Sequence, residues 1–184
     1  MSGANTELGG TQRERIGVLF VCLGNICRSP LAEGIFIHLA RERGGLDRYD
    51  VDSCGTGAWH AGHDADSRST RVAAKYGITL VHEARQLEPH ADFARFHLLV
   101  PMDRSNMRGV LAAGSRYGVN PARVRLMRSF DPTHVATAEA PEVPDPYEGS
   151  DDGFERVYQM LHRACTGLLD RLSSPDGLES ILNR

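Results

Sequence analysis

Residues 16–30 read Ile-Gly-Val-Leu-Phe-Val-Cys-Leu-Gly-Asn-Ile-Cys-Arg-Ser-Pro. The first seven residues are almost continuously apolar, which is typical of a strand buried on both faces of a parallel sheet. Ser29 and Pro30 then predict the start of a helix, as N-cap and first helical residue. Leu31 and Ile35 begin an apolar repeat of four residues behind them. The stretch therefore predicts a strand, a short loop and a helix.

Strand and helix patterns alternate along the rest of the chain. We expect strands at residues 49–53, 96–100 and 124–127, and helices at residues 66–76, at 103–113 and up to 172. Gly44 and Gly77 are expected to end the first two helices. Asp152 and Glu155 have the spacing of a capping box at the start of the last helix. This alternation predicts one α/β domain around a parallel sheet, with its site beyond the carboxyl ends of the strands.

Three segments are expected along the chain. Residues 1–15 form a flexible N-terminal extension, residues 16–173 the domain and residues 174–184 a C-terminal tail. The net charge of −3 gives no reason to expect nucleic-acid binding. The first residues carry no apolar core of a signal peptide, and no stretch approaches the roughly 18 apolar residues of a membrane span. We therefore expect a cytoplasmic protein with no membrane contact, although release by a route without a signal peptide stays open.

The segment from Cys22 to Ser29 carries the chemistry. A loop that leads into a helix N-terminus turns backbone N–H groups toward one point, where an anion such as phosphate can bind. Gly24 allows a close approach of the backbone, and Asn25 tolerates the left-handed conformation that such a loop needs. Arg28 can grip two phosphoryl oxygens with its planar fork. The same positive environment favours the thiolate of Cys22.

The spacing Cys-x5-Arg also occurs a second time, at Cys165 and Arg171. Those two residues lie within the last predicted helix and point to different sides of it. We interpret that match as chance. Cys22 differs because a buried strand precedes it, Gly and Asn lie within its loop, and Ser-Pro follows.

Residues 18–33, Val-Leu-Phe-Val-Cys-Leu-Gly-Asn-Ile-Cys-Arg-Ser-Pro-Leu-Ala-Glu, resemble the signature of low-molecular-weight protein tyrosine phosphatases. The resemblance continues from about residue 16 to residue 172. Further matching segments follow in the family's order, at residues 51–53, 84–87, 102–106 and 143–147. The Trp59 loop and residues 128–132 look especially like actinobacterial members.

The resemblance implies a four-stranded parallel sheet flanked by helices. It also implies hydrolysis of phosphotyrosine in proteins through a phosphocysteine intermediate, without a cofactor. Cys22 is then the nucleophile, Arg28 the phosphate clamp and Asp145 the general acid. The roles implied for the other loop residues are to shape the loop (Asn25 and Ser53), to steady the thiolate (Ser29) and to form a protective disulfide with the nucleophile (Cys27).

The walls of an aryl-binding cleft are expected from four residues. Trp59 and Tyr147 match the family, and Leu23 and Ile26 lie on the loop itself. Two departures from many relatives stand nearby. Glu148 replaces a second aromatic residue, and Tyr76 stands where some relatives carry a histidine that braces the loop, so the local hydrogen bonds are expected to differ here.

Some assignments stay open from the residues alone. Asp131-Pro132 is a second Asp-Pro pair beside Asp145-Pro146, and either could be a surface turn. His60 and His63 have no third metal ligand in pattern, so we expect no metal site.

Two other functions remain open as alternatives. A thioredoxin-coupled arsenate reductase shares this loop but needs further cysteines, and the chain has none between Cys54 and Cys165. A non-catalytic phosphotyrosine-binding module would be expected to have lost Cys22 or Asp145. We expect a monomer or weak dimer.

Overall fold

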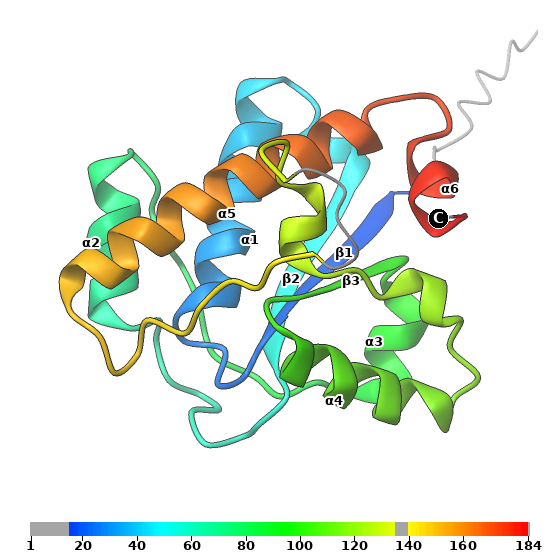
Figure 1. Ribbon diagram of the computed structural model, residues 1–184, viewed down its shortest axis with the longest axis horizontal. Coiled ribbons are helices and arrows are strands. Elements are labelled where there is room, and N and C mark those ends of the chain that lie inside the picture. The colour runs from blue at the N-terminus through cyan, green and yellow to red at the C-terminus, as the bar shows by residue number, and fades with distance from the viewer. Residues whose placement is uncertain (1–14, 135–139, 184) are drawn as a thin grey trace, which may run out of the picture.

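The computed structural model describes residues 15–134 and 140–183. Its centre is a parallel sheet with the strand order β2-β1-β3 (Figure 1). The strands are β1 (Ile16–Cys22), β2 (Tyr49–Gly55) and β3 (Leu98–Pro101). Cys22 pairs with Gly55 at the carboxyl end of the sheet. The predicted parallel sheet is confirmed, and Cys22 lies where the strand runs into the loop that follows it.

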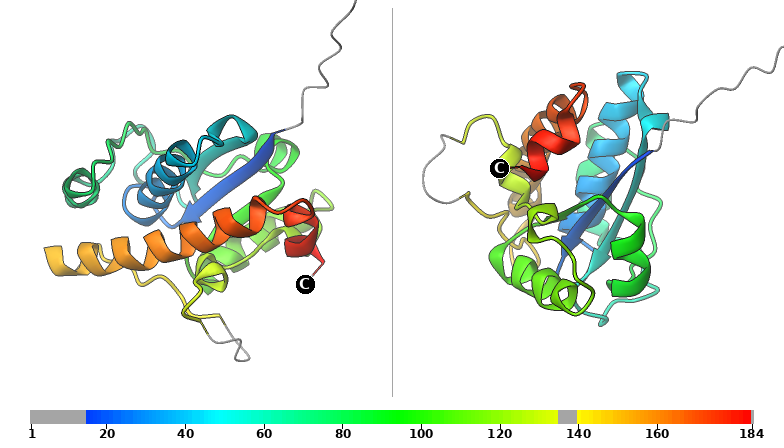
Figure 2. Two further views of the ribbon diagram at one scale, coloured as in Figure 1. Left: turned by 90° about the horizontal axis from the view of Figure 1, so that it is seen from above. Right: turned by 90° about the vertical axis from the view of Figure 1, so that its right-hand side faces the viewer.

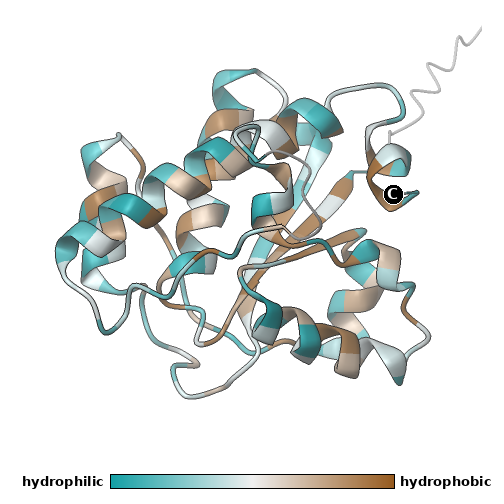
Figure 3. Ribbon diagram, in the orientation of Figure 1, coloured by the Kyte–Doolittle hydropathy of each residue, from teal (hydrophilic) through white to brown (hydrophobic). Residues whose placement is uncertain are grey.

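Strand β1 is buried on both faces, as its apolar run predicts. Val18 and Phe20 belong to one apolar cluster, with residues of helices α1 (Arg28–Glu42) and α5 (Asp151–Leu172). Leu19 and Val21 alternate with them and belong to a second cluster, with residues of α3 (Pro89–Arg95) and α4 (Arg104–Ser115). Figure 3 shows β1 and β3 as largely apolar segments, and the helices around them as mixtures of apolar and polar residues. The two-residue alternation of a strand therefore supplies a core to each face of the sheet.

Helices cover both faces of the sheet (Figure 2). Helices α1 and α5 pack against each other on one face, with α2 beside them, and α3 and α4 lie on the other. Their bounds are α1 (Arg28–Glu42), α2 (Ser67–Lys75), α3 (Pro89–Arg95), α4 (Arg104–Ser115), α5 (Asp151–Leu172) and α6 (Gly177–Leu182). Short 3-10 helices are η1 (Leu46–Arg48), η2 (Pro121–Arg123) and η3 (Met127–Phe130). The expected tail thus contains α6, whose Ile181 is buried.

The expectation of a fourth strand at residues 124–127 is wrong. Within the described residues this segment makes one isolated bridge, between Val124 and Leu99. The 3-10 helix η2 ends directly before Val124, and η3 begins at Met127. Only three residues remain between them, too few to continue a ladder, so the described part of the chain contains three strands.

The helix ends follow the sequence signals in part. Gly44 and Gly77 have φ angles of 67° and 74°, the left-handed conformation expected just after α1 and α2. Asp66 caps α2 by accepting a hydrogen bond from the Arg68 N–H. Helix α5, however, begins at Asp151 without a side-chain cap, so its predicted capping box is wrong.

Helix α1 also begins differently from the prediction. Its first residue is Arg28 and its N-cap position is Cys27, not Ser29. The hydroxyl of Ser29 bonds instead to the sulfur of Cys22, 3.0 Å away. Ser29, which the sequence predicts as a helix cap, thus bonds to a residue of the loop and does not cap the helix. No helix in residues 15–134 and 140–183 has the length and apolar character that crossing a membrane requires.

Asp131 begins a surface turn, in which the His134 N–H bonds to the Asp131 carbonyl oxygen and Pro132 and Thr133 are exposed. Its side chain is fully buried, and its carboxylate lies 3.4 Å from the Arg163 guanidinium of α5. Thr133 donates its backbone N–H and its hydroxyl to the same carboxylate. Burial alone would raise the pKa of Asp131, but the bonds from Thr133 and the charge of Arg163 outweigh it and hold that pKa below its usual value.

We expect Asp131→Asn to destabilise the protein at pH 7 by about 1–3 kcal/mol, since it removes charged hydrogen bonds from a buried site. The lowered pKa means that this contribution is present above the unfolded-state value of 3.8 and is lost as the pH falls through the folded-state value. Urea denaturation at pH 7 and pH 3 measures the difference. Asp170→Asn is the control, because Asp170 pairs with Arg43 at the exposed surface and should cost less than about 1 kcal/mol. An Asp131→Asn effect of equal size at both pH values would contradict the assignment.

Candidate active site

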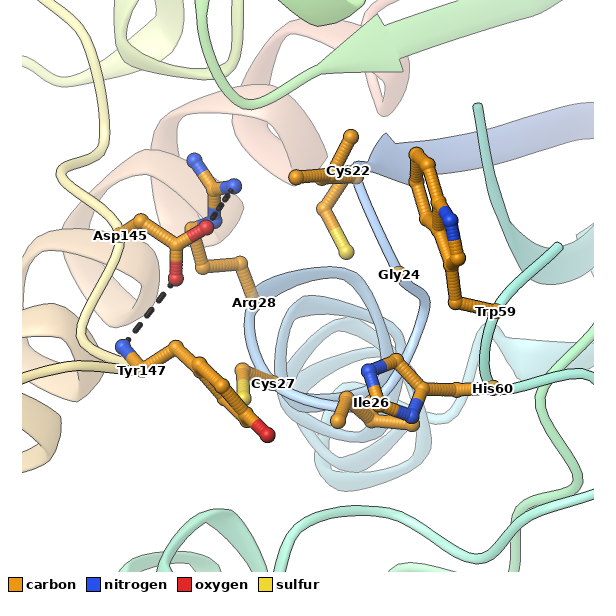
Figure 4. A pocket seen from close by; sticks show the side chains of 10 residues that line it. Cys22, Gly24, Ile26, Cys27, Arg28, Trp59, His60, Asp145 and Tyr147 are labelled. Atoms are coloured by element: carbon orange, nitrogen blue, oxygen red, sulfur yellow. Dashed lines mark hydrogen bonds and ion pairs between the residues drawn. The ribbon is translucent and has the colours of Figure 1, made fainter. Parts of the chain in front are cut away.

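A cavity of about 160 Å³ opens at the carboxyl end of β1 (Figure 4). Its walls come from the loop after β1, from the loop after β2 and from the segment before α5. Nine of the residues predicted from the sequence line it, together with His60. They are Cys22, Leu23, Gly24, Ile26, Cys27, Arg28, Trp59, Asp145 and Tyr147. The other three predicted residues, Asn25, Ser29 and Ser53, lie buried outside the lining.

The loop of residues 22–28, here called the anion loop, encloses the sulfur of Cys22. The backbone N–H of Asn25 points at this sulfur from 3.2 Å, and the Ser29 hydroxyl lies 3.0 Å from it. Because α1 begins at Arg28, the N-terminal end of this helix, which carries the positive end of the helix dipole, directly follows the loop. The loop thus gathers hydrogen-bond donors around one buried sulfur, an arrangement that suits an anion.

Asn25 makes several hydrogen bonds within and around the anion loop. It is fully buried and has a φ angle of 55°, the left-handed conformation that its residue type tolerates. Its side-chain amide donates to the hydroxyls of Ser29 and Ser53, each at 2.9 Å. Its side-chain oxygen accepts from the backbone N–H of Arg85 at 2.8 Å. These three hydrogen bonds from one side chain hold the left-handed turn of the loop at Asn25.

A second group of residues braces Asn25 from below. The Ser53 hydroxyl donates to the Glu33 carboxylate at 2.7 Å, and a ring nitrogen of His82 lies 2.6 Å from the Asn25 carbonyl oxygen. Burial raises the pKa of Glu33 to about 7. A histidine thus braces the loop in this chain, but from position 82. The Tyr76 hydroxyl bonds instead to Glu155 of α5.

Arg28 lies between two carboxylates. Its guanidinium donates to Asp103 at 2.7 Å and to Asp145 at 2.5 Å, and it is 3% exposed. A buried guanidinium needs such partners because its charge has left water. Asp103 stands at the start of α4, directly beyond the carboxyl end of β3. Sequence reasoning missed Asp103, although the position of the site at the strand ends could have pointed to it.

Asp145 stands in a segment without helix or strand, between two prolines. Val143, before it, donates its backbone N–H to the Met102 carbonyl beyond β3. After it, the Tyr147 N–H bonds to the Asp145 carboxylate at 3.2 Å. The carboxylate therefore faces Arg28 and the cavity (Figure 4). Of the two Asp-Pro pairs, the one at residue 145 lies in the site.

Two aromatic rings stand at the mouth of the cavity. Trp59 and Tyr147 lie on opposite sides of it in Figure 4, and their exposures are 72% and 44%. His60 lies between them along the rim, with its ring 6.1 Å from that of Tyr147. Sequence reasoning considered His60 only as a metal ligand. Its position next to Trp59 in the sequence could have indicated that His60 also lies at the rim of the cavity.

The remaining cysteines lie away from the cavity. Cys165 is fully buried within α5, and burial raises the pKa of its thiol. The interpretation of Cys165 and Arg171 as a chance match agrees with this placement. Cys54 is buried on the opposite face of the sheet from Cys22. Neither thiol lines the site.

Comparison with known proteins identifies similar chains. The model of the family described as low molecular weight phosphotyrosine protein phosphatase matches residues 17–176. A low molecular weight protein-tyrosine-phosphatase from Streptomyces coelicolor is 45% identical over 154 residues, 83% of this chain and 90% of that relative. The human low molecular weight phosphotyrosine protein phosphatase is 38% identical over 154 residues, 84% of this chain and 94% of its own.

A solved structure is also similar. It is a protein tyrosine phosphatase from Entamoeba histolytica, with Hepes in the active site. The TM-score is 0.77 at 35% identity, and the match covers 85% of this chain and 96% of that one. All the residues predicted for the site fall within the compared region.

The bracing role of Asn25 can be tested by Asn25→Ala. This change removes three hydrogen bonds and places a less tolerant residue in a left-handed conformation. We expect the affinity for inorganic phosphate, measured by titration calorimetry, to fall about ten- to a hundredfold. Asn183→Ala, at an exposed position after α6, should leave this affinity unchanged. An unchanged affinity in Asn25→Ala would show that the loop keeps its shape without the side chain.

Proposed function

Because the chain belongs to the low molecular weight phosphotyrosine protein phosphatase family, we propose that Cys22, Arg28 and Asp145 are the residues through which it hydrolyses phosphotyrosine. The protein-tyrosine phosphatase activity follows from the family and the relatives. The observation that carries the residue assignment is a single cavity that holds the Cys22 sulfur, the Arg28 guanidinium and the Asp145 carboxylate, with aromatic rings at its mouth.

In the proposed first step the Cys22 thiolate attacks the phosphorus of the aryl phosphate. A sulfur–phosphorus bond forms and the bond from phosphorus to the phenolic oxygen breaks. Asp145 gives its proton to that oxygen, so the leaving group departs as a neutral phenol. The backbone N–H groups of the anion loop and the fork of Arg28 stabilise the charge on the phosphoryl oxygens.

In the second step a water molecule attacks the phosphocysteine. The Asp145 carboxylate takes a proton from the water, and the sulfur–phosphorus bond breaks to release phosphate. The Cys22 thiolate forms again. Ser29 stabilises it by donating its hydroxyl, a role that its 3.0 Å distance from the sulfur supports.

The resting ion pair of Arg28 with Asp145 bears on this sequence of steps. In the first step the Asp145 carboxyl has to reach the leaving oxygen, and its ion pair with Arg28 holds it elsewhere. We infer that the phosphoryl dianion of the substrate competes for Arg28 and frees Asp145 to take up a proton. Asp103, which holds the same guanidinium at 2.7 Å, keeps Arg28 in place during the exchange.

The depth of the cavity supports aryl phosphates over alkyl phosphates. The sulfur of Cys22 lies at its base, since this residue is 2% exposed, while Trp59 and Tyr147 stand at the rim. A phosphotyrosine ring between these two rings would carry its phosphate down to the anion loop. The side chains of phosphoserine and phosphothreonine are shorter than that of phosphotyrosine and would not carry the phosphate as deep into the cavity. We therefore propose phosphotyrosine-containing proteins as the substrates.

Further expectations remain proposals. A monomer or weak dimer in the cytoplasm is one of them, and a protective Cys22–Cys27 disulfide is another. Cys27 lines the cavity beside Cys22, which supports the pairing. Burial raises the pKa of Cys27 to about 12, so its thiolate fraction is small at neutral pH and the disulfide would form slowly.

The nucleophile is tested by hydrolysis of p-nitrophenyl phosphate. We expect Cys22→Ser to abolish activity, because a serine hydroxyl at this position is not ionised and attacks poorly. Cys165→Ser is the matched control and should keep the wild-type rate, since Cys165 lies outside the cavity. Activity that survived in Cys22→Ser, or that EDTA removed, would contradict the proposed chemistry. Loss of hydrolysis in the wild type with retained phosphotyrosine-peptide binding would favour a binding module.

The general acid is tested by Asp145→Ala. We expect kcat on phenyl phosphate to fall by about 10²–10⁴, the range for lost general-acid catalysis. The fall of the rate with rising pH, which reflects loss of the acid's proton, should also weaken in this variant. The matched control is Asp170→Ala, which removes a carboxylate paired with Arg43 at the exposed surface and outside the cavity. An unchanged kcat in Asp145→Ala would remove Asp145 from the mechanism.

A further inference from the structure

Arg68, in the first turn of α2, contacts two parts of the active site without lining its cavity. Its guanidinium forms a fork with the Asp66 carboxylate, with distances of 3.0 Å and 2.8 Å. A third nitrogen donates to the Gly149 carbonyl oxygen at 3.2 Å. Residues 66 and 149 come from distant parts of the sequence, so Arg68 connects two segments that the chain does not join directly.

The first of these segments is fixed to the anion loop. The backbone N–H of Asp66 donates to the Ile26 carbonyl oxygen at 2.8 Å. One residue beyond Arg68, the Ser69 hydroxyl donates to the Cys27 carbonyl oxygen at 3.3 Å. The start of α2 is thus hydrogen-bonded to the loop that holds the nucleophile. Arg68 therefore lies on a part of α2 whose neighbouring residues are hydrogen-bonded to the anion loop.

The second segment carries the proposed general acid. Residues 143–149, here called the acid segment, contain no helix or strand. On the near side of Asp145, the segment is bonded to β3 through Val143 and Met102. On the far side, the contacts of Arg68 hold it. The guanidinium bonds to Gly149 and lies 5.7 Å from the centroid of the Tyr147 ring.

Phe154 completes the site of Arg68. The guanidinium lies 4.4 Å from the centroid of this buried ring in the first turns of α5. Stacking on an aromatic face suits the planar guanidinium and holds its fork in one orientation. The Arg68 bonds also keep the pKa of Asp66 below its usual value. Asp66 therefore stays ionised, and paired with Arg68, at pH values above 3.8.

We propose that Arg68 is a positioning residue for the general acid, which acts by fastening the acid segment to the anion loop. The proposal rests on the proposed function of Asp145. Proton transfer requires the acid to lie within hydrogen-bond distance of the leaving oxygen, and an error of about 1 Å can cost about a hundredfold in rate. Without Arg68, the far end of the acid segment loses its bond to α2 and the support under the Tyr147 ring.

The test compares aryl phosphates whose phenols differ in acidity. The p-nitrophenolate ion is a weak base and needs little protonation, while phenolate needs the acid. We expect Arg68→Gln to lower kcat/KM for phenyl phosphate about tenfold and to change that for p-nitrophenyl phosphate less than about threefold. Arg68→Lys keeps the charge but not the fork, and should give an intermediate loss.

The matched control is Arg71→Gln. Arg71 lies one turn further along α2 and pairs with Asp151 at the exposed surface. Arg71→Gln removes the same charge as Arg68→Gln. Arg71 also contacts the start of α5, but it touches neither Asp66 nor Tyr147. The ratio of kcat/KM for phenyl phosphate to that for p-nitrophenyl phosphate should therefore be the same in Arg71→Gln as in the wild type. Inhibition by inorganic phosphate should be unchanged in Arg68→Gln, which shows that the anion loop is intact.

A double-mutant cycle separates the two proposals. In an Asp145→Ala background, Arg68→Gln should cause no further loss on phenyl phosphate, because the group it positions is gone. Equal losses on both substrates, a similar pattern in Arg71→Gln, or additive effects in the double variant would overturn the role of Arg68. Full activity in Asp145→Ala alone would instead overturn the proposed function. If Arg68→Gln does not fold, Arg68→Lys supplies the same comparison.

Discussion

The active site depends on the left-handed turn at Asn25. Several backbone N–H groups must point at one place, and their dipoles repel one another there when no anion is bound. Asn25 makes the turn sterically possible, and its side chain bonds to Ser29, Ser53 and Arg85. The same turn exposes the Asn25 carbonyl on the far side of the loop, where His82 bonds to it. The anion loop is therefore held open by side chains from three other segments.

Arg28 is the second constraint, because a single guanidinium serves two carboxylates. Asp103 and Asp145 both reach it in the absence of substrate. One carboxylate comes from the end of β3 and the other from the irregular segment before α5. In the proposed mechanism, a phosphoryl group that enters the cavity changes the partners of Arg28, and Asp145 is one of those partners. Substrate binding and readiness of the acid are linked through one side chain.

The sequence predicts those parts of the fold and of the site whose residues are neighbours along the chain. The strand β1, the anion loop and the start of α1 follow one another in the sequence, and the spacing of Cys22, Asn25 and Arg28 reflects their geometry. The fourth strand failed because η2 and η3 leave only three residues between them, so the bridge between Val124 and Leu99 does not extend into a ladder. His82 bonds to a residue 57 positions away, and Arg68 bonds to Gly149 across 81 positions. No periodicity or motif records such contacts, so only the folded chain shows them.

Ser29 illustrates a local signal with two readings. Serine before proline is expected helix-start chemistry, yet here the hydroxyl bonds to Cys22 and the helix begins at Arg28. The hydroxyl lies 3.0 Å from the sulfur and accepts a hydrogen bond from the Asn25 side-chain amide at 2.9 Å, so its partners belong to the anion loop.

The chain contains one tryptophan, Trp59, and its side chain is 72% exposed at the mouth of the cavity. Indole emission responds to the polarity around the ring, which is already largely aqueous in the folded state. Unfolding therefore changes this emission little, whereas a ring-bearing molecule that enters the cavity covers the indole directly. The fluorescence of this protein reports the occupancy of its active site rather than the integrity of its core.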